Sequence, residues 1–128
     1  MKKGSCLCGG VKFELIGELR PVIACHCRQC RKTSGHYFAS TQIDKKGLKL
    51  IKDLGLAWHK SSKIARRGFC KFCGSSLFWD PHGNRISIAA GSIDSPTNLN
   101  MTTHIYLKDN GDYYYVNDDL KHFQIDRK

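Results

Sequence analysis

The sequence lacks the features that mark membrane, secreted and repetitive proteins. No apolar run approaches the ~18 residues that a membrane-spanning helix needs. The N-terminal Met1-Lys2-Lys3-Gly4 has no apolar stretch of the kind found in a signal peptide. There is no internal repeat, linker or low-complexity tract. We therefore expect a cytoplasmic protein without a membrane segment, folded as a single domain over residues 1–128.

Acidic residues are scarce. The 128 residues include 11 Asp and Glu against 21 Lys and Arg, which gives a formal net charge of +10. The excess is concentrated in residues 45–71, where nine basic residues face one acid, Asp53. The simplest interpretation is that these residues lie on solvated strand faces. Two functional alternatives are attraction of an anionic small substrate and contact with a nucleic-acid backbone.

The chain has seven cysteines, an odd number that internal disulfides cannot fully pair. They form three tight groups: Cys6-Leu7-Cys8, then Cys25-His26-Cys27-Arg28-Gln29-Cys30, then Cys70-Lys71-Phe72-Cys73. Thiols stay reduced in the cytosol, which disfavours disulfides. Such groups suit a soft divalent metal, because Cys-x-x-Cys spans a tight turn and Cys-x-Cys on a strand places both sulfurs on one face.

Seven cysteines divide into four plus three. The contiguous Cys25, Cys27 and Cys30 can surround one ion by themselves, and the two pairs together supply four ligands: Cys6, Cys8, Cys70 and Cys73. Four thiolates close a structural zinc site, whereas three leave a position open, as in catalytic zinc sites. A rival partition joins one pair to part of the trio. A zinc ion with four thiolates carries a charge of about −2, and one with three thiolates carries about −1. Two filled zinc sites would therefore lower the net charge to about +7.

Short strands separated by turns predict an all-β fold. We expect strands at residues 11–15, 22–24, 36–43, 48–51, 56–60, 64–69, 77–79, 85–90, 104–107 and 113–116. Asn110-Gly111 is typical of a hairpin turn. No segment of a dozen residues has helical periodicity, although residues 28–33 can form one helical turn that ends at Ser34-Gly35.

Four segments resemble the glutathione-dependent formaldehyde-activating enzyme family. They are Gly4-Ser5-Cys6-Leu7-Cys8-Gly9-Gly10-Val11, Cys25-His26-Cys27-Arg28-Gln29-Cys30-Arg31, Phe69-Cys70-Lys71-Phe72-Cys73-Gly74-Ser75-Ser76-Leu77 and a C-terminal pattern from Gly91-Ser92-Ile93-Asp94 to His104-Ile105. The resemblance implies an Mss4-like zinc-containing β-sheet fold. It also implies structural zinc at Cys6, Cys8, Cys70 and Cys73, and catalytic zinc at Cys25, Cys27 and Cys30.

The same resemblance implies a carbon–sulfur lyase that joins glutathione and formaldehyde into S-hydroxymethylglutathione. An open three-cysteine zinc site suits this chemistry, because a thiol that coordinates zinc is deprotonated. Arg31 is a candidate for holding substrate carboxylates, and His104 for a general base or a substrate contact. The simpler interpretation of Arg31 is a surface charge, and that of His104 is a strand histidine with satisfied hydrogen bonds. His26 should point away from the metal, since it lies between two ligands.

The alternative function is a zinc-stabilised binding module whose basic segment contacts nucleic acid. Centromere protein V, which resembles the same family, motivates this alternative. The basic residues of segment 45–71 are not interleaved with a clear aromatic stacking platform, so nucleic acid is the less favoured partner. A sulfoxide reductase is disfavoured because no cysteine follows Cys73.

Overall fold

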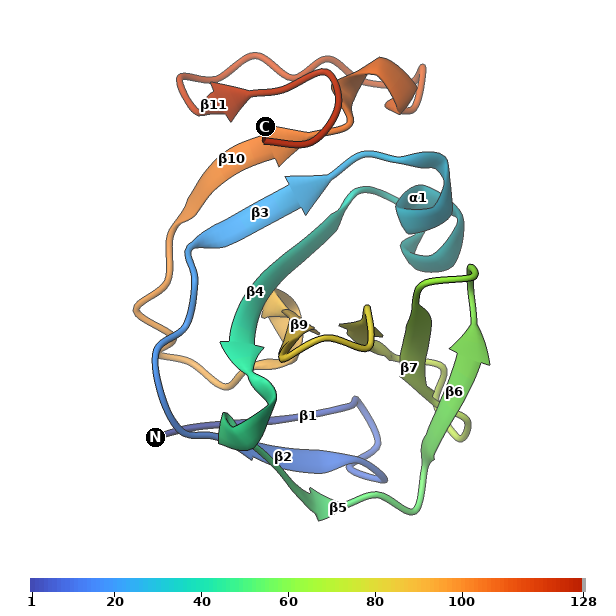
Figure 1. The fold of residues 1–128 in the computed structure, drawn as a ribbon, viewed down its shortest axis with the longest axis vertical. Helices are drawn as coiled ribbons and strands as arrows, with labels where there is room; N and C mark the ends of the chain where they lie inside the picture. The colour runs from blue at the N-terminus through green and yellow to red at the C-terminus, as the bar shows by residue number, and fades with distance from the viewer. Residues whose placement is uncertain (128) are drawn as a thin grey trace. The chain divides into compact units, whose positions relative to one another are not determined.

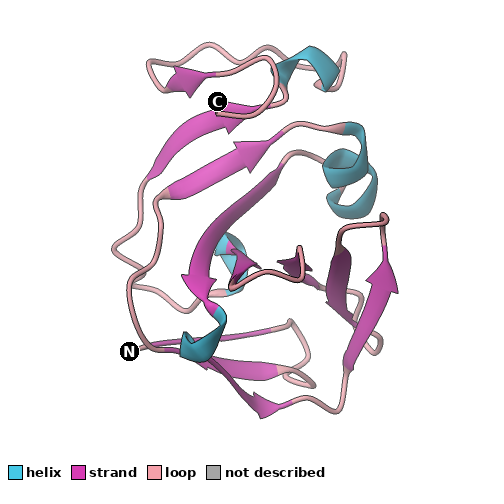
Figure 2. Cartoon of the chain, viewed as in Figure 1, coloured by secondary structure: helices cyan, strands magenta, loops and turns pink. Residues whose placement is uncertain are grey.

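The computed structural model describes residues 1–127 and confirms the predicted all-β class (Figures 1 and 2). These residues form eleven strands in two sheets, one α-helix and three short 3-10 helices. They divide into two compact units, the first comprising residues 1–20 and 41–98 and the second comprising residues 21–40 and 99–127. In the described part of the chain, no helix is long and apolar enough to cross a bilayer. The single domain over residues 1–128 stays a prediction.

The first unit contains a three-stranded antiparallel sheet. Its strands are β1 (Lys2–Ser5), β2 (Lys12–Leu15) and β5 (Leu48–Lys52), in the order β1-β2-β5. The alternation in β2 behaves as predicted, because Phe13 and Leu15 are buried and Lys12 is exposed. Strand β1 was not predicted, since its sequence carries no apolar pattern. A Cβ atom on Gly4 would lie 2.4 Å from the Phe13 ring, so only glycine allows this close pairing.

Four further strands of the first unit pair in chain order. They are β6 (Leu56–Lys60), β7 (Arg66–Cys70), β8 (Ser76–Asp80) and β9 (Arg85–Ala89), and each neighbouring pair is antiparallel. The core of this unit includes Leu77, Phe78 and Ile88, all fully buried. Phe78 meets Phe13 edge-to-face with ring centroids 5.4 Å apart. The 3-10 helix η1 (Lys45–Gly47) precedes β5, and the 3-10 helix η2 (Ala90–Ser92) follows β9.

The second unit is built around β3 (Val22–Cys25). It pairs in parallel with β10 (Met101–Ile105) and antiparallel with the start of β4 (Phe38–Asp44), whose later residues belong to the first unit. Strand β11 (Lys121–His122) pairs in parallel with β10. Helix α1 (Arg28–Ser34) connects β3 to β4, and η3 (Leu107–Asp109) follows β10. Figure 1 shows β11, β10 and β3 side by side.

Two sequence predictions in the second unit are wrong. Residues 113–116 form no strand, and Asn110-Gly111 is no hairpin turn. The rings of Tyr113 and Tyr114 lie together, with centroids 4.7 Å apart, instead of on opposite faces as a strand requires. Each tyrosine hydroxyl bonds a histidine, His36 for Tyr113 and His26 for Tyr114. These long-range contacts override the local β propensity.

Candidate metal centres

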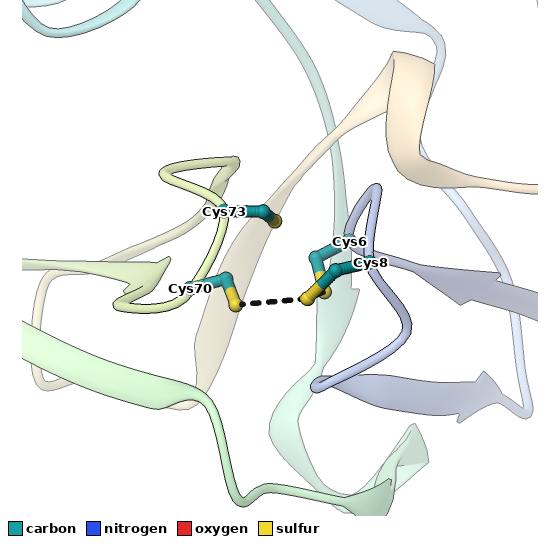
Figure 3. Close-up of side chains that lie close together, drawn as sticks. All are labelled: Cys6, Cys8, Cys70 and Cys73. Atoms are coloured by element: carbon teal, nitrogen blue, oxygen red, sulfur yellow. Dashed lines mark hydrogen bonds between the residues drawn. The ribbon is translucent and has the colours of Figure 1, made fainter.

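Four cysteine sulfurs converge in the first unit (Figure 3). Cys6 and Cys8 lie in the turn after β1, Cys70 ends β7, and Cys73 lies in the turn before β8. All four sulfurs lie within 4.8 Å of one another, and Cys8 Sγ is 3.7 Å from both Cys6 Sγ and Cys70 Sγ. The structure thus brings together the two pairs that the spacing analysis joined.

Two turns aim these sulfurs at one point. In the first, the Val11 and Gly10 amides donate to Cys6 Sγ and Cys8 Sγ at 3.2 and 3.4 Å. Cys6 and Cys8 therefore converge from a turn, and the expectation that a strand would align them is wrong. The second turn runs from Cys70 to Ser75, and its Gly74 adopts the left-handed conformation with φ of 79°.

The distances between the four sulfurs fit a metal ion. A tetrahedral ion with metal–sulfur bonds of about 2.3 Å separates its sulfur ligands by about 3.8 Å. The separations of Cys8 Sγ from Cys6 Sγ and from Cys70 Sγ, both 3.7 Å, match this expected sulfur–sulfur distance. None of the four is in a disulfide, so each can offer a thiolate.

The ionisation of these thiols is uneven. The Ser75 hydroxyl, 3.2 Å from Cys73 Sγ, is the main cause that lowers the pKa of Cys73 to about 5. The Gly10 amide lowers the pKa of Cys8, but burial and the other three thiols outweigh it and raise this pKa to about 11. Four adjacent thiols cannot all ionise without a cation between them, so this group suits a divalent metal.

Gly55 allows the chain to pass close to this cluster. Its amide donates to Gly10 O at 2.9 Å and its carbonyl accepts from the Lys71 amide at 2.7 Å. A Cβ atom here would lie 2.7 Å from Cys70 Sγ. Gly55 thus connects the N-terminal turn with the turn after β7 through backbone hydrogen bonds.

Three cysteine sulfurs converge in the second unit. Cys25 ends β3, Cys27 caps the N-terminus of α1, and Cys30 lies in the helix. Their sulfurs lie within 4.8 Å of one another, and the Cys30 amide donates to Cys27 Sγ at 3.3 Å. Cys30 is buried, whereas Cys25 and Cys27 are half-buried. Three sulfurs this close together can supply three ligands of a tetrahedral ion, which leaves the fourth position for another ligand.

The trio also suits a cation. The neighbouring Cys27 and Cys30 thiols and burial raise the pKa of Cys25 far above its ordinary value. The Cys25 proton is therefore retained unless a positive charge stabilises the thiolate. A metal ion bound by the three sulfurs would supply that charge.

The two other predicted site residues lie in the second unit, and each has partners. Arg31 is half-buried on α1, and its Nε donates to Asp109 O at 3.3 Å. His104 is buried on β10, with Nδ1 2.8 Å from His26 Nε2 and Nε2 2.8 Å from Asp118 Oδ2. Both ring nitrogens of His104 are therefore engaged within the protein.

Sequence reasoning missed a chain of hydrogen bonds that crosses the second unit. It runs from Tyr114 to His26, His104, Asp118 and His122. His26 is fully buried, and its two ring nitrogens bond Tyr114 and His104. Burial and the neighbouring His104 lower the pKa of His26 to about 4, so His26 is neutral at pH 7. No local pattern links His26 to Tyr114 or to His104, because 88 and 78 residues separate the two bonded pairs.

Part of the basic segment is neutralised within the first unit. Asp80 is buried and pairs with Lys45 Nζ at 2.7 Å and Arg66 Nε at 3.0 Å. The Arg66 guanidinium also lies 3.8 Å from the centroid of the Trp58 ring. Arg67 is buried as well. These residues have structural partners, which weakens the argument for a nucleic-acid surface.

Comparisons with known proteins agree with the cysteine pattern. The family described as glutathione-dependent formaldehyde-activating enzyme matches residues 1–109. A Schizosaccharomyces pombe protein named as an uncharacterized lyase is 27% identical over 127 residues, which cover 97% of this chain and 91% of that relative. The crystal structure of a Rhodobacter sphaeroides protein aligns with a TM-score of 0.61 and 21% identity, over 78% of this chain and 99% of the other. The last comparison shows a shared fold.

Proposed function

The chain belongs to the glutathione-dependent formaldehyde-activating enzyme family, and from that premise we propose that it is a carbon–sulfur lyase that joins glutathione, or a related small thiol, to a small aldehyde. In this addition the thiol sulfur forms a bond to the aldehyde carbon and the thiol proton passes to the aldehyde oxygen. One observation carries the proposal: Cys25, Cys27 and Cys30 gather three sulfurs within 4.8 Å at a helix start.

We assign one zinc ion to each cysteine cluster. Cys6, Cys8, Cys70 and Cys73 would hold a structural ion, and Cys25, Cys27 and Cys30 would hold the ion at the reaction site. When bound, the second ion supplies an open position at which a substrate thiol loses its proton. Because the four-cysteine cluster has no position left, it is assigned no part in the reaction.

The basic residues of α1 are suited to holding the substrate. Arg28 and Lys32 are exposed, and Arg31 lies between them in the sequence. Glutathione carries carboxylates, which guanidinium and ammonium groups bind by charge-assisted hydrogen bonds. The bond from Arg31 Nε to Asp109 O restricts the motion of its guanidinium. We assign His104 a positioning role through His26, because its own ring nitrogens are engaged.

Thermal unfolding with two ligands tests the proposal. Glutathione should stabilise the protein, by about 2.7 kcal/mol at a hundredfold excess over its Kd, because it binds the folded state. S-methylglutathione has the same carboxylates but no thiol proton to lose, and it should stabilise less. In Cys27→Ser the difference between the ligands should disappear. Equal stabilisation of the unaltered protein by both ligands would contradict the proposal.

A rate measurement tests the reaction itself. The protein should accelerate the approach to equilibrium between glutathione and carbon-13 formaldehyde, followed by carbon NMR. Cys27→Ser should lose this acceleration, whereas Cys73→Ser is unsuitable as a control because it is expected to affect folding. An exposed cation outside the site, Lys63→Ala, provides the matched control and should retain full activity.

A further inference from the structure

The second unit holds another group of ligand side chains, separate from the cysteines. One ring nitrogen of His104, one of His122 and a carboxylate oxygen of Asp118 lie within 4.8 Å of one another. The parallel pairing of β10 and β11 places His104 directly opposite His122. Asp118 bridges them, with Oδ2 2.8 Å from His104 Nε2 and Oδ1 2.9 Å from His122 Nε2.

We propose that His104, Asp118 and His122 form a third metal site, which binds a divalent first-row transition ion such as zinc, cobalt or nickel. Two imidazoles and one carboxylate are a common ligand set for such ions. With bonds of about 2.1 Å, adjacent ligand atoms lie about 3.0 Å apart around an octahedral ion and about 3.4 Å apart around a tetrahedral one. The two nitrogen–oxygen separations of 2.8 and 2.9 Å are close to the octahedral value, and a tetrahedral ion would need the side chains to move apart by about 0.5 Å.

The cluster is held in place before a metal enters. His104 is only 3% exposed, and its Nδ1 is 2.8 Å from His26 Nε2, which fixes the direction in which Nε2 points. Hydrogen bonds of this kind to the second ring nitrogen orient metal-binding histidines. The pKa of Asp118 is lowered to about 2, chiefly by His122, so its carboxylate is ionised at neutral pH. Asp118 and His122 are exposed, which leaves an ion a path from solvent.

Metal binding at this site would reverse the hydrogen-bond chain. Without metal, the ionised Asp118 can only accept, so His104 donates from Nε2; in the neutral form of His104, Nδ1 then accepts from His26 Nε2. Neutral His26 then accepts the Tyr114 hydroxyl at Nδ1. A metal on His104 Nε2 moves the proton to Nδ1. His104 Nδ1 then donates to His26 Nε2, and His26 Nδ1 donates to the Tyr114 hydroxyl oxygen.

Counting bound zinc tests the site. After equilibration with excess zinc and gel filtration, the unaltered protein should retain one zinc ion per chain more than His122→Ala or Asp118→Asn does. Both changes are at exposed positions, so the fold should persist, and circular dichroism verifies this. His59→Ala removes an exposed histidine of β6 and should retain as much zinc as the unaltered protein. Equal zinc in His122→Ala and the unaltered protein would overturn the proposal. Because the comparison is a difference, it holds whatever the cysteines bind.

Nitrogen-15 NMR of the imidazole rings gives a second readout. Raising zinc from one to several equivalents should move the ring proton of His104 from Nε2 to Nδ1, and that of His26 from Nε2 to Nδ1. In His122→Ala, zinc should no longer cause these shifts. His59 should be unaffected. Unchanged His104 nitrogen signals in the unaltered protein under excess zinc would contradict the site.

Discussion

Asp80 is one of the few acidic residues of the chain, and its carboxylate makes several contacts within the first unit. Its carboxylate is buried at the end of β8 and accepts from Lys45 Nζ, Arg66 Nε and the His82 amide at 2.7, 3.0 and 2.8 Å. Burial alone would raise its pKa, but these donors outweigh burial and lower the pKa of Asp80 to about 2. The carboxylate is thus a structural centre for three segments of the first unit.

Replacing Asp80 should therefore destabilise the fold. We expect Asp80→Asn to lower the free energy of unfolding by about 2 kcal/mol at pH 7, because the amide cannot compensate Lys45 and Arg66. The folded pKa lies below the unfolded value, so this stabilisation is present above pH ~4 and is lost as pH falls through about 2. Urea unfolding of both proteins at pH 7 and pH 2.5 measures the difference.

The control is Asp94→Asn, which alters an exposed acid. It should unfold as the unaltered protein does at both pH values. If Asp80→Asn lost no stability at pH 7, or if its deficit did not shrink in acid, the Asp80 ion pairs would not contribute as we infer.

At the scale of elements, α1 is defined by its ends. A helix of seven residues has little stability of its own, since nucleation is unfavourable. Cys27 caps its first turn by accepting from the Cys30 amide, and Gly35 ends it in the left-handed conformation with φ of 86°. The helix therefore depends on Cys27 at one end and Gly35 at the other, and both positions affect the three-cysteine site.

Gly35 and Gly83 form a matched pair for testing the helix end. A Cβ atom would meet no neighbour within 4 Å at either position, but only Gly35 of the two has a left-handed φ. Gly35→Ala should therefore destabilise the protein by about 1 kcal/mol through backbone strain, and Gly83→Ala should be neutral or slightly stabilising. Thermal melts of the two variants separate these outcomes. Similar melting points would show that α1 does not need the left-handed end.

At the scale of the whole molecule, the two cysteine clusters differ in what they connect. The four-cysteine cluster joins turns that are far apart in the sequence, since Cys8 and Cys70 are 62 residues apart. The trio spans only residues 25–30. A metal in the first cluster would therefore restrict much more of the chain, and its binding energy would contribute to folding of the first unit.

Single serine substitutions should separate the two clusters. Cys73→Ser should lower Tm by more than about 10 °C or prevent folding, because an incomplete ligand set loses several kcal/mol of metal binding. Cys27→Ser should largely preserve Tm and abolish activity. Differential scanning calorimetry and metal analysis of both variants test this. Equal losses of Tm would show that the division of roles is wrong.

Several features of the fold were predictable from the sequence because they depend on neighbouring residues. Strand β6 coincides with the predicted residues 56–60, and α1 ends at Gly35 as expected. The buried Phe13 and Leu15 follow from their alternation with Lys12 and Glu14. Strand β1 was missed, because its pairing depends on the Phe13 ring over Gly4 and not on its own pattern.

The sequence by itself determined the grouping of cysteines, because ligands two or three residues apart share a turn or a helix start whatever surrounds them. It also determined the all-β class through short apolar segments and turns. Only the tertiary structure decided how Tyr114, His26, His104, Asp118 and His122 connect. The tyrosine and His26 are 88 residues apart, and no local periodicity encodes a hydrogen bond over that distance. Packing of β3 beside β10 and β10 beside β11 brings these side chains together.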